Sequence, residues 1–586
     1  MEILCYTRDS LEDILYANKL AYSMHLALKR GQEMDFVPLH HNEGLLYAKA
    51  VQREDGTLVA KSLCSPWVFQ KKEGGYGVVA VRIEGDGQPD TDSEGCMLLW
   101  ESMDLVHYRE IGLVRLQEKG YISKVCCEYS QTDGTYKICW EDRDGRLKQA
   151  VGDPFAGCME KACEPELGTI IPWADSQVIE ASGGIEGCRP GNILTIPDEV
   201  GNYLWKKLTV PFCERVVLLE NEGSAEAGDT VQPRALAYYS DGTVVERGID
   251  WNPDSGMGRV HQEHFPFPFA ENRADPCCMY WHGKYYFIAT NDADGNHTLY
   301  IRCADTLEGI LTAEEVLLLD SVTYSGIGGL LWAPEFHEID GRLYIFHAAT
   351  KGEFFWEESR VMQLREGGNP MCREDWSEPR LVVRKDGTPL CEAGRVISLD
   401  MTTFEYEGRV YAMWSQRQFL PVDQGAWLYL AEIDRKEPWR LLSDPVCVAL
   451  PEYGWENNHT FVVEGPYAIW NREQLMVTYS GAAVDATYAV GLLKPVMGSN
   501  ILEPSNWIKN NYPLLTSRSV PGEFGPGHNS YMTDENGLTW NFYHAKPGVD
   551  GPRSSCARRV HFDVDGEPML DVTEEADLPQ ENMYGF

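Results

Sequence analysis

Three acidic residues in the second half of the chain, Asp275, Asp400 and Glu464, stand in apolar surroundings that are unusual for carboxylates. Carboxyl groups can donate and accept protons, and two of them in one cleft can act as an acid and a base. The three residues are far apart in the sequence, so only the fold can bring them together. Whether they form a site therefore depends on the elements that carry them.

Each of the three lies beside a recurring pattern that predicts a β-hairpin. An apolar or aromatic run, a turn with Gly or a charge, and a Tyr-rich run occur five times, for example as YWHGKYYFIA at 280–289. Hairpins about 60 residues apart, with no helical pattern between them, are typical of propeller blades. The sequence therefore predicts five blades around one central channel, with turns near Gly283, Gly341, Gly408, Glu473 and Gly537.

A polar or acidic phrase precedes each hairpin, at the strand end that should face the channel. In chain order the phrases are RADP (273–276), LWAPEFH (331–337), SLDMTTF (398–404), VEGPY (463–467) and GPGHNS (525–530). Taken singly, each phrase also fits a structural role: a turn, a capping Asp, a loop or a core histidine. Their recurrence at the blade period favours an active site on the channel.

The rest of the chain predicts further β-modules, because 586 residues are too many for one hydrophobic core. Residues 1–172 have strand-like runs and echo the blade hairpin near Gly74 and Gly134, which predicts a propeller-like all-β module, complete or incomplete. Residues 173–260 predict an Ig-like β-sandwich, with strands at 192–196, 204–210 and 215–219. There ALAYYSDGTVVERGIDW resembles bacterial immunoglobulin-like domains. Residues 261–586 are predicted to form the five-bladed β-propeller, with closing strands at 558–570. The predicted fold class of the whole chain is therefore all-β.

Composition excludes several classes of partner. The net charge of −39 argues against nucleic acid and against an anionic membrane surface, since both require a basic footprint. No run of 18 apolar residues occurs, so the sequence predicts no membrane-spanning segment. The first residues show no basic segment followed by an apolar core, and the 17 cysteines form no CxxC pair. We therefore expect reduced thiols and a cytoplasmic location.

The five phrases, in this order, resemble glycoside hydrolase family 43. SLDMTTF, EGPYAI, GPGHNS and the run YSGAAVDATYAVGLL at 479–493 are similar to the branch with exo-acting α-L-arabinofuranosidases on 1,5-linked arabinan. The resemblance covers residues 261–570. It implies a five-bladed propeller and a glycosidase that needs no cofactor for its chemistry.

The resemblance also implies roles for individual residues. Asp275 matches the family's general base, Glu464 its general acid, and Asp400 the carboxylate that orients the acid and tunes its pKa. His528 matches a residue on the channel axis, in contact with substrate and beside a water or a structural Ca²⁺. The expected substrate-binding wall consists of Trp332, Glu335 and Trp414, and the aromatic run 354–356 lies where it could join them.

The chemistry implied is inverting hydrolysis of a glycosidic bond. One carboxyl group protonates the departing oxygen while another deprotonates the attacking water. The acid must remain protonated near neutral pH, so burial and the charge of Asp400 are expected to raise the pKa of Glu464. Expected substrates are plant cell-wall oligosaccharides, arabinan or arabinoxylan fragments, that lose terminal α-L-arabinofuranosyl units. Two alternatives remain open, a β-D-xylosidase on the same fold and a propeller that only binds carbohydrate.

Overall fold

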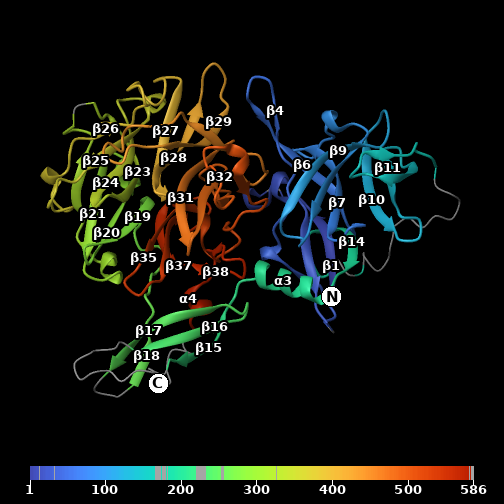
Figure 1. Ribbon diagram of the computed structural model, residues 1–586, viewed down its shortest axis with the longest axis horizontal. Coiled ribbons are helices and arrows are strands. Elements are labelled where there is room, and N and C mark those ends of the chain that lie inside the picture. Colours follow the sequence, from blue (N-terminus) through green and yellow to red (C-terminus); the bar gives the residue numbers. More distant parts are fainter. Residues whose placement is uncertain are drawn as a thin grey trace. The chain divides into compact units, whose positions relative to one another are not determined.

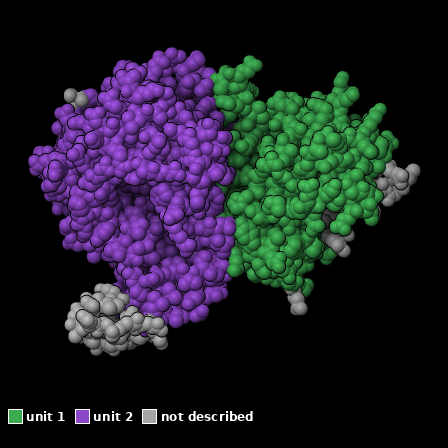
Figure 2. All heavy atoms as spheres, viewed as in Figure 1, with its two compact units in different colours: residues 1–209, 452–458, 510–512 green, residues 210–451, 459–509, 513–586 purple. Residues whose placement is uncertain are grey.

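The computed structural model describes residues 1–586 except 12, 32, 165–172, 174–179, 181–182, 220–232, 253–256, 325, 580 and 582–586. The fold is all-β, as predicted, and divides into two compact units (Figure 2). Unit 1 comprises residues 1–209, 452–458 and 510–512, and unit 2 the remainder. The predicted boundaries at residues 172 and 260 stay a prediction. Among the described residues, every helix is too short or too polar to cross a membrane.

Unit 2 contains the five predicted blades, each an antiparallel sheet with strands in chain order (Figure 1). The first strand of each sheet contacts the first strand of the next, and β35 contacts β19, which closes the ring. The blades are β19 (Arg273–Trp281), β20 (Lys284–Asn291), β21 (Thr298–Ala304) and β22 (Val316–Asp320); β23 (Gly329–Ile339), β24 (Arg342–Thr350), β25 (Glu358–Gln363) and β26 (Arg380–Leu381); β27 (Val396–Tyr406), β28 (Arg409–Gln418), β29 (Gly425–Glu432) and β30 (Val446–Ala449); β31 (Val463–Asn471), β32 (Gln474–Gly481), β33 (Ala489–Pro495) and β34 (Trp507–Lys509); and β35 (Phe524–Thr533), β36 (Thr539–Lys546) and β37 (Ser554–Arg559).

The innermost strand of every blade carries a β-bulge at the same place. Pairing with the second strand shifts register there in all five sheets. One residue at each bulge has a positive φ, which is costly for any residue except glycine. A bulge changes the direction of the side chains beside it. The repeated bulge therefore sets the orientation of the residues in the five phrases. The positive-φ residues are Asp275, Ala333, Asp400, Gly465 and His528.

Hydrophobic clusters pack neighbouring blades against each other. Trp414 on β28 is fully buried in the cluster that joins the second and third blades, where its ring stacks on that of Tyr429. The prediction that Trp414 contacts substrate is therefore wrong. Successive side chains of a strand point to opposite faces, and position 414 faces the neighbouring blade.

A small antiparallel sheet extends unit 2. Its strands are β15 (Cys213–Leu218), β16 (Arg234–Tyr239), β17 (Val244–Asn252) and β18 (Met257–Val260). The described residues of 210–260 form this single sheet, so the second layer of the predicted sandwich is not among them. Buried Asp577, on helix α4 (Glu574–Asp577), accepts hydrogen bonds from Arg247 and Arg559 and so ties the sheet to the fifth blade. Strands β38 (His561–Phe562) and β39 (Pro568–Met569) lie in the predicted closing segment.

The strand predicted at 204–210 is wrong, because these residues lie mostly in helix α3 (Asp198–Leu208) of unit 1. Asp198 and Glu199 occupy its first turn and Lys206 and Lys207 its last, which complements the helix dipole. Leu204 and Leu208 are buried on one side. The helical spacing of the buried residues in this segment therefore decides its structure, and the short apolar alternation that predicted a strand does not.

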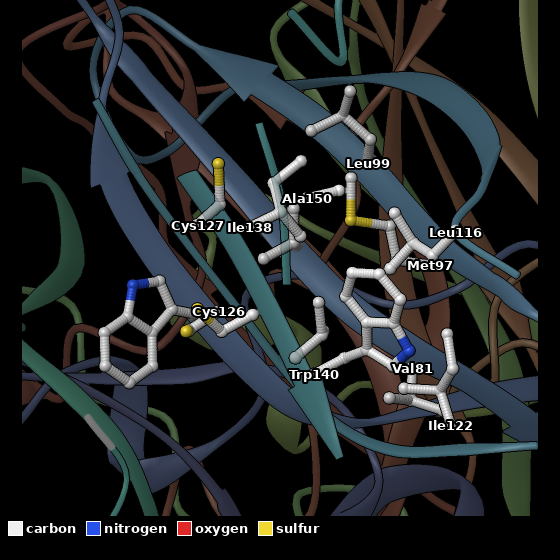
Figure 3. Close-up of a cluster of buried hydrophobic side chains, with 14 of the residues drawn as sticks. Val81, Met97, Leu99, Leu116, Ile122, Cys126, Cys127, Ile138, Trp140 and Ala150 are labelled. Atoms are coloured by element: carbon white, nitrogen blue, oxygen red, sulfur yellow. The ribbon is translucent and has the colours of Figure 1, made fainter. Parts of the chain in front are cut away.

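Unit 1 contains three four-stranded sheets and a two-stranded one among its described residues. Figure 3 shows a core cluster of this unit, in which Trp140 packs among aliphatic side chains such as Val81 and Ile122. Strand β6 has the same feature as the innermost blade strands, a register shift with a positive φ at Ser65. The strands are β14 (Cys188–Thr195), β1 (Glu2–Arg8), β2 (His25–Lys29) and β3 (Val37–Pro38); β6 (Lys61–Gln70), β7 (Tyr76–Glu84), β8 (Cys96–Ser102) and β9 (Tyr108–Arg115); β10 (Ile122–Ser130), β11 (Thr135–Asp142), β12 (Leu147–Asp153) and β13 (Cys158–Met159); and β4 (Val51–Gln52) and β5 (Leu58–Val59), with a short helix α1 (Asn18–Ala21).

Candidate active site

One cavity of about 390 Å³ in unit 2 gathers the three predicted carboxylates. Asp275, Asp400 and Glu464 all line it, although they come from three different blades. Trp332 and His528 line it too. A wider cleft of about 1470 Å³ in unit 1 contains none of the predicted residues. The ring of blades therefore produces the convergence that the sequence indicated.

Glu335 does not line the cavity and is the second error in the predicted pocket wall. Its side chain is buried, and its Oε2 lies 2.7 Å from Nε2 of His337 on the same strand. Residues 335 and 337 share a face of β23 because the side-chain period of a strand is two. Trp332 lies between the two register shifts of β23 and lines the cavity, with its indole N–H donating to Oδ1 of Asn296 (2.9 Å).

Asp275 is held by hydrogen-bond donors and by a permanent positive charge. Thr290 Oγ1 donates to its Oδ2 (2.7 Å), and Arg553 Nη1 donates to its Oδ1 (3.2 Å). The same guanidinium donates to both oxygens of Asp292 (2.8 and 2.9 Å), which fixes its orientation. Burial alone would raise the pKa of Asp275, but Arg553, His528 and His544 together outweigh burial and hold the pKa well below the usual range. The residue is thus an ionised carboxylate suited to act as a base.

Two imidazoles complete the surroundings of Asp275. Nδ1 of His528 lies 3.3 Å from Oδ1, and the backbone N–H of Asp275 donates to Nδ1 of His544 (3.2 Å). Burial lowers the pKa of His528 to about 4 and also lowers that of His544. Both rings are therefore neutral at pH 7, and Arg553 is the permanent positive charge beside Asp275.

Asp400 accepts a hydrogen bond from the bulge of β31, which directly follows Glu464. The backbone N–H of Gly465 donates to Oδ2 of Asp400 (3.1 Å). Position 465 favours glycine, because its φ is +55° and a Cβ there would lie only 3.1 Å from Nδ1 of His528. Burial and the neighbouring Glu464 raise the pKa of Asp400 well above its usual range. Asp400 and Glu464 thus titrate together as one coupled pair.

Glu464 has the properties of a proton donor. It lines the cavity, and the hydroxyl of Tyr488 donates to its Oε1 (2.7 Å). Burial raises its pKa to about 6, the Tyr488 hydrogen bond opposes that rise, and the charge of Asp275 adds to it. The expectation that an ionised Asp400 raises this pKa needs correction. Asp400 itself holds a proton strongly, so burial and Asp275 are the causes.

Several residues around the carboxylates carried no signal that the sequence alone could assign. Tyr488 lies within the run 479–493, but one tyrosine in a strand-like segment indicates no particular contact. Arg553 precedes β37 in a connection without a motif, and Arg417 lies at the end of β28. Their roles appear only when the blades are assembled.

Replacing Tyr488 by Phe is expected to move the alkaline limb of the pH profile. In the wild type, kcat/KM should fall as pH rises through about 6, because the protonated fraction of Glu464 is lost. Loss of a hydrogen bond that lowers this pKa should shift the limb upward by about half to one pH unit. The control is Tyr531→Phe, which removes a buried hydroxyl that donates to Thr478 outside the cavity. An unmoved limb in Tyr488→Phe would contradict the coupling to Glu464.

The described residues do not build a calcium cage at the axial position. None of them forms a group of three or more His, Cys, Asp or Glu side chains that could hold a metal ion. Nε2 of His528 is buried without a hydrogen-bond partner among the described residues. It is a nitrogen, whereas calcium prefers six to eight oxygen ligands. The Ca²⁺ at His528 therefore stays a prediction from the resemblance, and no step of the chemistry depends on it.

Known proteins resemble the propeller half of the chain. An enzyme of Streptomyces chartreusis named extracellular exo-α-(1→5)-L-arabinofuranosidase is 32% identical over 281 residues, 48% of this chain and 81% of that protein. An enzyme of the same name from Streptomyces avermitilis is 31% identical over 318 residues, 53% of this chain and 63% of that protein. The crystal structure of α-L-arabinofuranosidase from Lactobacillus brevis has 30% identity and a TM-score of 0.46, over 52% of this chain and 95% of that one.

These names correct the predicted location. Both Streptomyces enzymes are named extracellular, which contradicts the cytoplasmic location expected for this chain. That expectation depended on the missing leader pattern and on thiols expected to be reduced. No disulfide joins any of the 17 cysteines, all of which lie in the described part of the chain, but neither observation determines a location.

The family itself follows from the sequence profile and the site together. Residues 266–568 match the profile of glycosyl hydrolases family 43. The matched segment contains all five blades and the three carboxylates of the cavity. The chain therefore belongs to glycosyl hydrolases family 43.

Proposed function

We propose that this protein is an α-L-arabinofuranosidase that removes terminal arabinofuranosyl units from arabinose-containing oligosaccharides with inversion at the anomeric carbon. The observation that carries the proposal is that the pKa values of two carboxyl groups in one cavity are shifted in opposite directions. Arg553 keeps Asp275 ionised, whereas burial raises the pKa of Glu464 to about 6. A pair of carboxyl groups whose environments push their pKa values apart supplies an acid and a base.

In the proposed mechanism the two groups act on opposite sides of the scissile bond. Glu464 gives its proton to the glycosidic oxygen as the C–O bond breaks, and so becomes a carboxylate. Asp275 takes a proton from a water molecule whose oxygen attacks the anomeric carbon from the other face. The products are arabinose and the shortened chain, and the enzyme regains its starting state when the proton returns from Asp275 to Glu464 through solvent.

The neighbouring residues hold these groups in place for both steps. Tyr488 orients Oε1 of Glu464, and Thr290 and Arg553 orient the two oxygens of Asp275. Asp400 titrates together with Glu464, and the backbone N–H of Gly465 holds its carboxyl group in place. Trp332 provides an aromatic wall for the sugar in the cavity.

The choice of sugar is supported by the names of the relatives, which specify α-(1→5)-linked arabinofuranosyl groups. Arabinan fragments of plant cell walls contain such groups, and arabinoxylan fragments, the other expected substrate, carry arabinofuranosyl units as side groups on xylose. The cavity of about 390 Å³ is of the size found for small-ligand sites.

Two measurements test this function. The first compares kcat/KM for 4-nitrophenyl α-L-arabinofuranoside and 4-nitrophenyl β-D-xylopyranoside, and we expect the arabinofuranoside to be preferred. The second follows the first-formed sugar by proton NMR, where inversion gives the β-anomer. Preference for the xyloside would favour the β-D-xylosidase alternative. An initial α-anomer would exclude inversion. Sugar binding without turnover would favour the purely binding alternative.

A further inference from the structure

Four aromatic side chains form a partly exposed surface beside the cavity, here called the aromatic shelf: Phe354, Phe355, Trp356 and Phe419. The first three form the 3-10 turn η7 between β24 and β25 and are 37%, 45% and 46% exposed. Three consecutive large aromatics rarely face solvent together without a function, because contiguous exposed apolar patches mark binding surfaces. Neither the proposed mechanism nor the blade cores use this surface.

The aromatic shelf is continuous with the catalytic cavity. Phe354 lines the cavity, and its ring lies 5.9 Å from that of Trp332. Phe419 joins Phe354 and Phe355, with ring centroids 5.5 and 5.0 Å away. The surface therefore runs without interruption from the sugar site toward solvent.

Polar groups border the same surface. The guanidinium of Arg417 lies 4.8 Å from the centroid of the Phe419 ring, and Arg417 also lines the cavity. Asp423 holds this guanidinium through two hydrogen bonds of 2.7 and 3.1 Å. Apolar faces next to fixed donors and acceptors match a sugar ring, which has C–H faces and hydroxyl edges.

The turn that carries the shelf is held in place before any ligand binds. The N–H of Gly394 donates to the carbonyl of Phe355 (2.9 Å), and that of Trp356 donates to the carbonyl of Glu353 (3.0 Å). Thr350 Oγ1 donates to the same Glu353 carbonyl. An anchored surface loses less conformational freedom on binding than a loose loop.

We infer that the aromatic shelf binds the sugar residues on the leaving-group side of the scissile bond. This inference rests on the proposed function, in which the cavity holds the terminal arabinofuranosyl unit and the remaining chain must leave through the cavity mouth. The shelf is continuous with the cavity, and a second and third sugar can stack on Phe355, Phe419 and Trp356. The enzyme then selects for longer oligosaccharides, although it removes one unit at a time.

A length series of α-(1→5)-arabino-oligosaccharides tests this inference. For the wild type, kcat/KM should rise from arabinobiose to arabinotetraose. Trp356→Ala and Phe355→Ala should each reduce the ratio of the tetraose value to the biose value by about 3- to 10-fold. The matched control is Trp470→Ala, which removes a 39%-exposed tryptophan from β31, outside the cavity lining. This ratio is measured within each variant, so partial loss of folded protein does not affect it.

Three outcomes would overturn the inference. The length dependence could be absent in the wild type, or it could survive unchanged in both shelf variants. Sedimentation could also show a wild-type dimer that Trp356→Ala converts to a monomer, which would make the shelf a contact between copies of the chain. Failure of the proposed function would look different, because the wild type would then turn over no arabino-oligosaccharide of any length.

Discussion

Replacing Glu464 by Gln is expected to lower kcat/KM on arabino-oligosaccharides by about 10²–10⁴-fold, the range that a general acid contributes. A sugar leaving group departs as a poor alkoxide unless it receives a proton, and Gln has none to give at this position. The cavity keeps its shape, because glutamine has the size of glutamate and can still accept the hydrogen bond from Tyr488. Sugar binding should therefore persist, as measured by calorimetry with arabinobiose.

The leaving group provides the sharpest check on this role. With 2,4-dinitrophenyl α-L-arabinofuranoside the loss should be much smaller, since that phenolate departs without protonation. Glu392→Gln serves as the control, because this carboxylate is exposed and lies outside the cavity lining. Full turnover of oligosaccharides by Glu464→Gln would remove Glu464 from the role of acid.

Replacing Asp275 by Asn should lower kcat/KM by a similar 10²–10⁴-fold, but equally for good and poor leaving groups. The base acts on the attacking water, so the quality of the leaving group cannot compensate for its loss. Asparagine also leaves Arg553 facing a neutral amide, although Asp292 still pairs with that guanidinium. The measurement is the ratio of kcat/KM for the dinitrophenyl substrate to that for arabinobiose, which should match the wild type.

Asp292→Asn is the matched control for that variant. Asp292 binds the same guanidinium, but it does not line the cavity. We expect a far smaller loss of activity, because the permanent charge of Arg553 remains beside Asp275. If Asp275→Asn kept its activity on the dinitrophenyl substrate alone, the roles of Asp275 and Glu464 would have to be exchanged.

The repeat along the chain was sufficient to predict the blades and the meeting of the three carboxylates. In a ring of similar sheets, equivalent positions of the innermost strands all face the same axis. The phrases around Asp275, Asp400 and Glu464 occupy such positions, so their spacing, together with the resemblance to the family, predicted that they converge. The bulge that presents them was not predicted, because a positive φ at Asp or His has no distinctive sequence signal.

Properties that depend on neighbours from other blades could not be predicted. Trp414 and Glu335 are the kinds of residue that contact sugars, yet one packs between blades and the other pairs with His337. Conversely, Arg553 and Tyr488 contact Asp275 and Glu464 of the cavity from segments that carried no assignable signal.

By itself, the sequence determined the ring, its number of blades and the three acids that belong to one chemistry. The tertiary structure decided in which direction the pKa of each acid shifts. That difference is set by burial and by the charged and hydrogen-bonding groups around each carboxyl, and both depend on side chains that meet only after the ring closes. Strand periodicity is local and can be found in a sequence, whereas the electric field at a carboxylate is a property of the assembled fold.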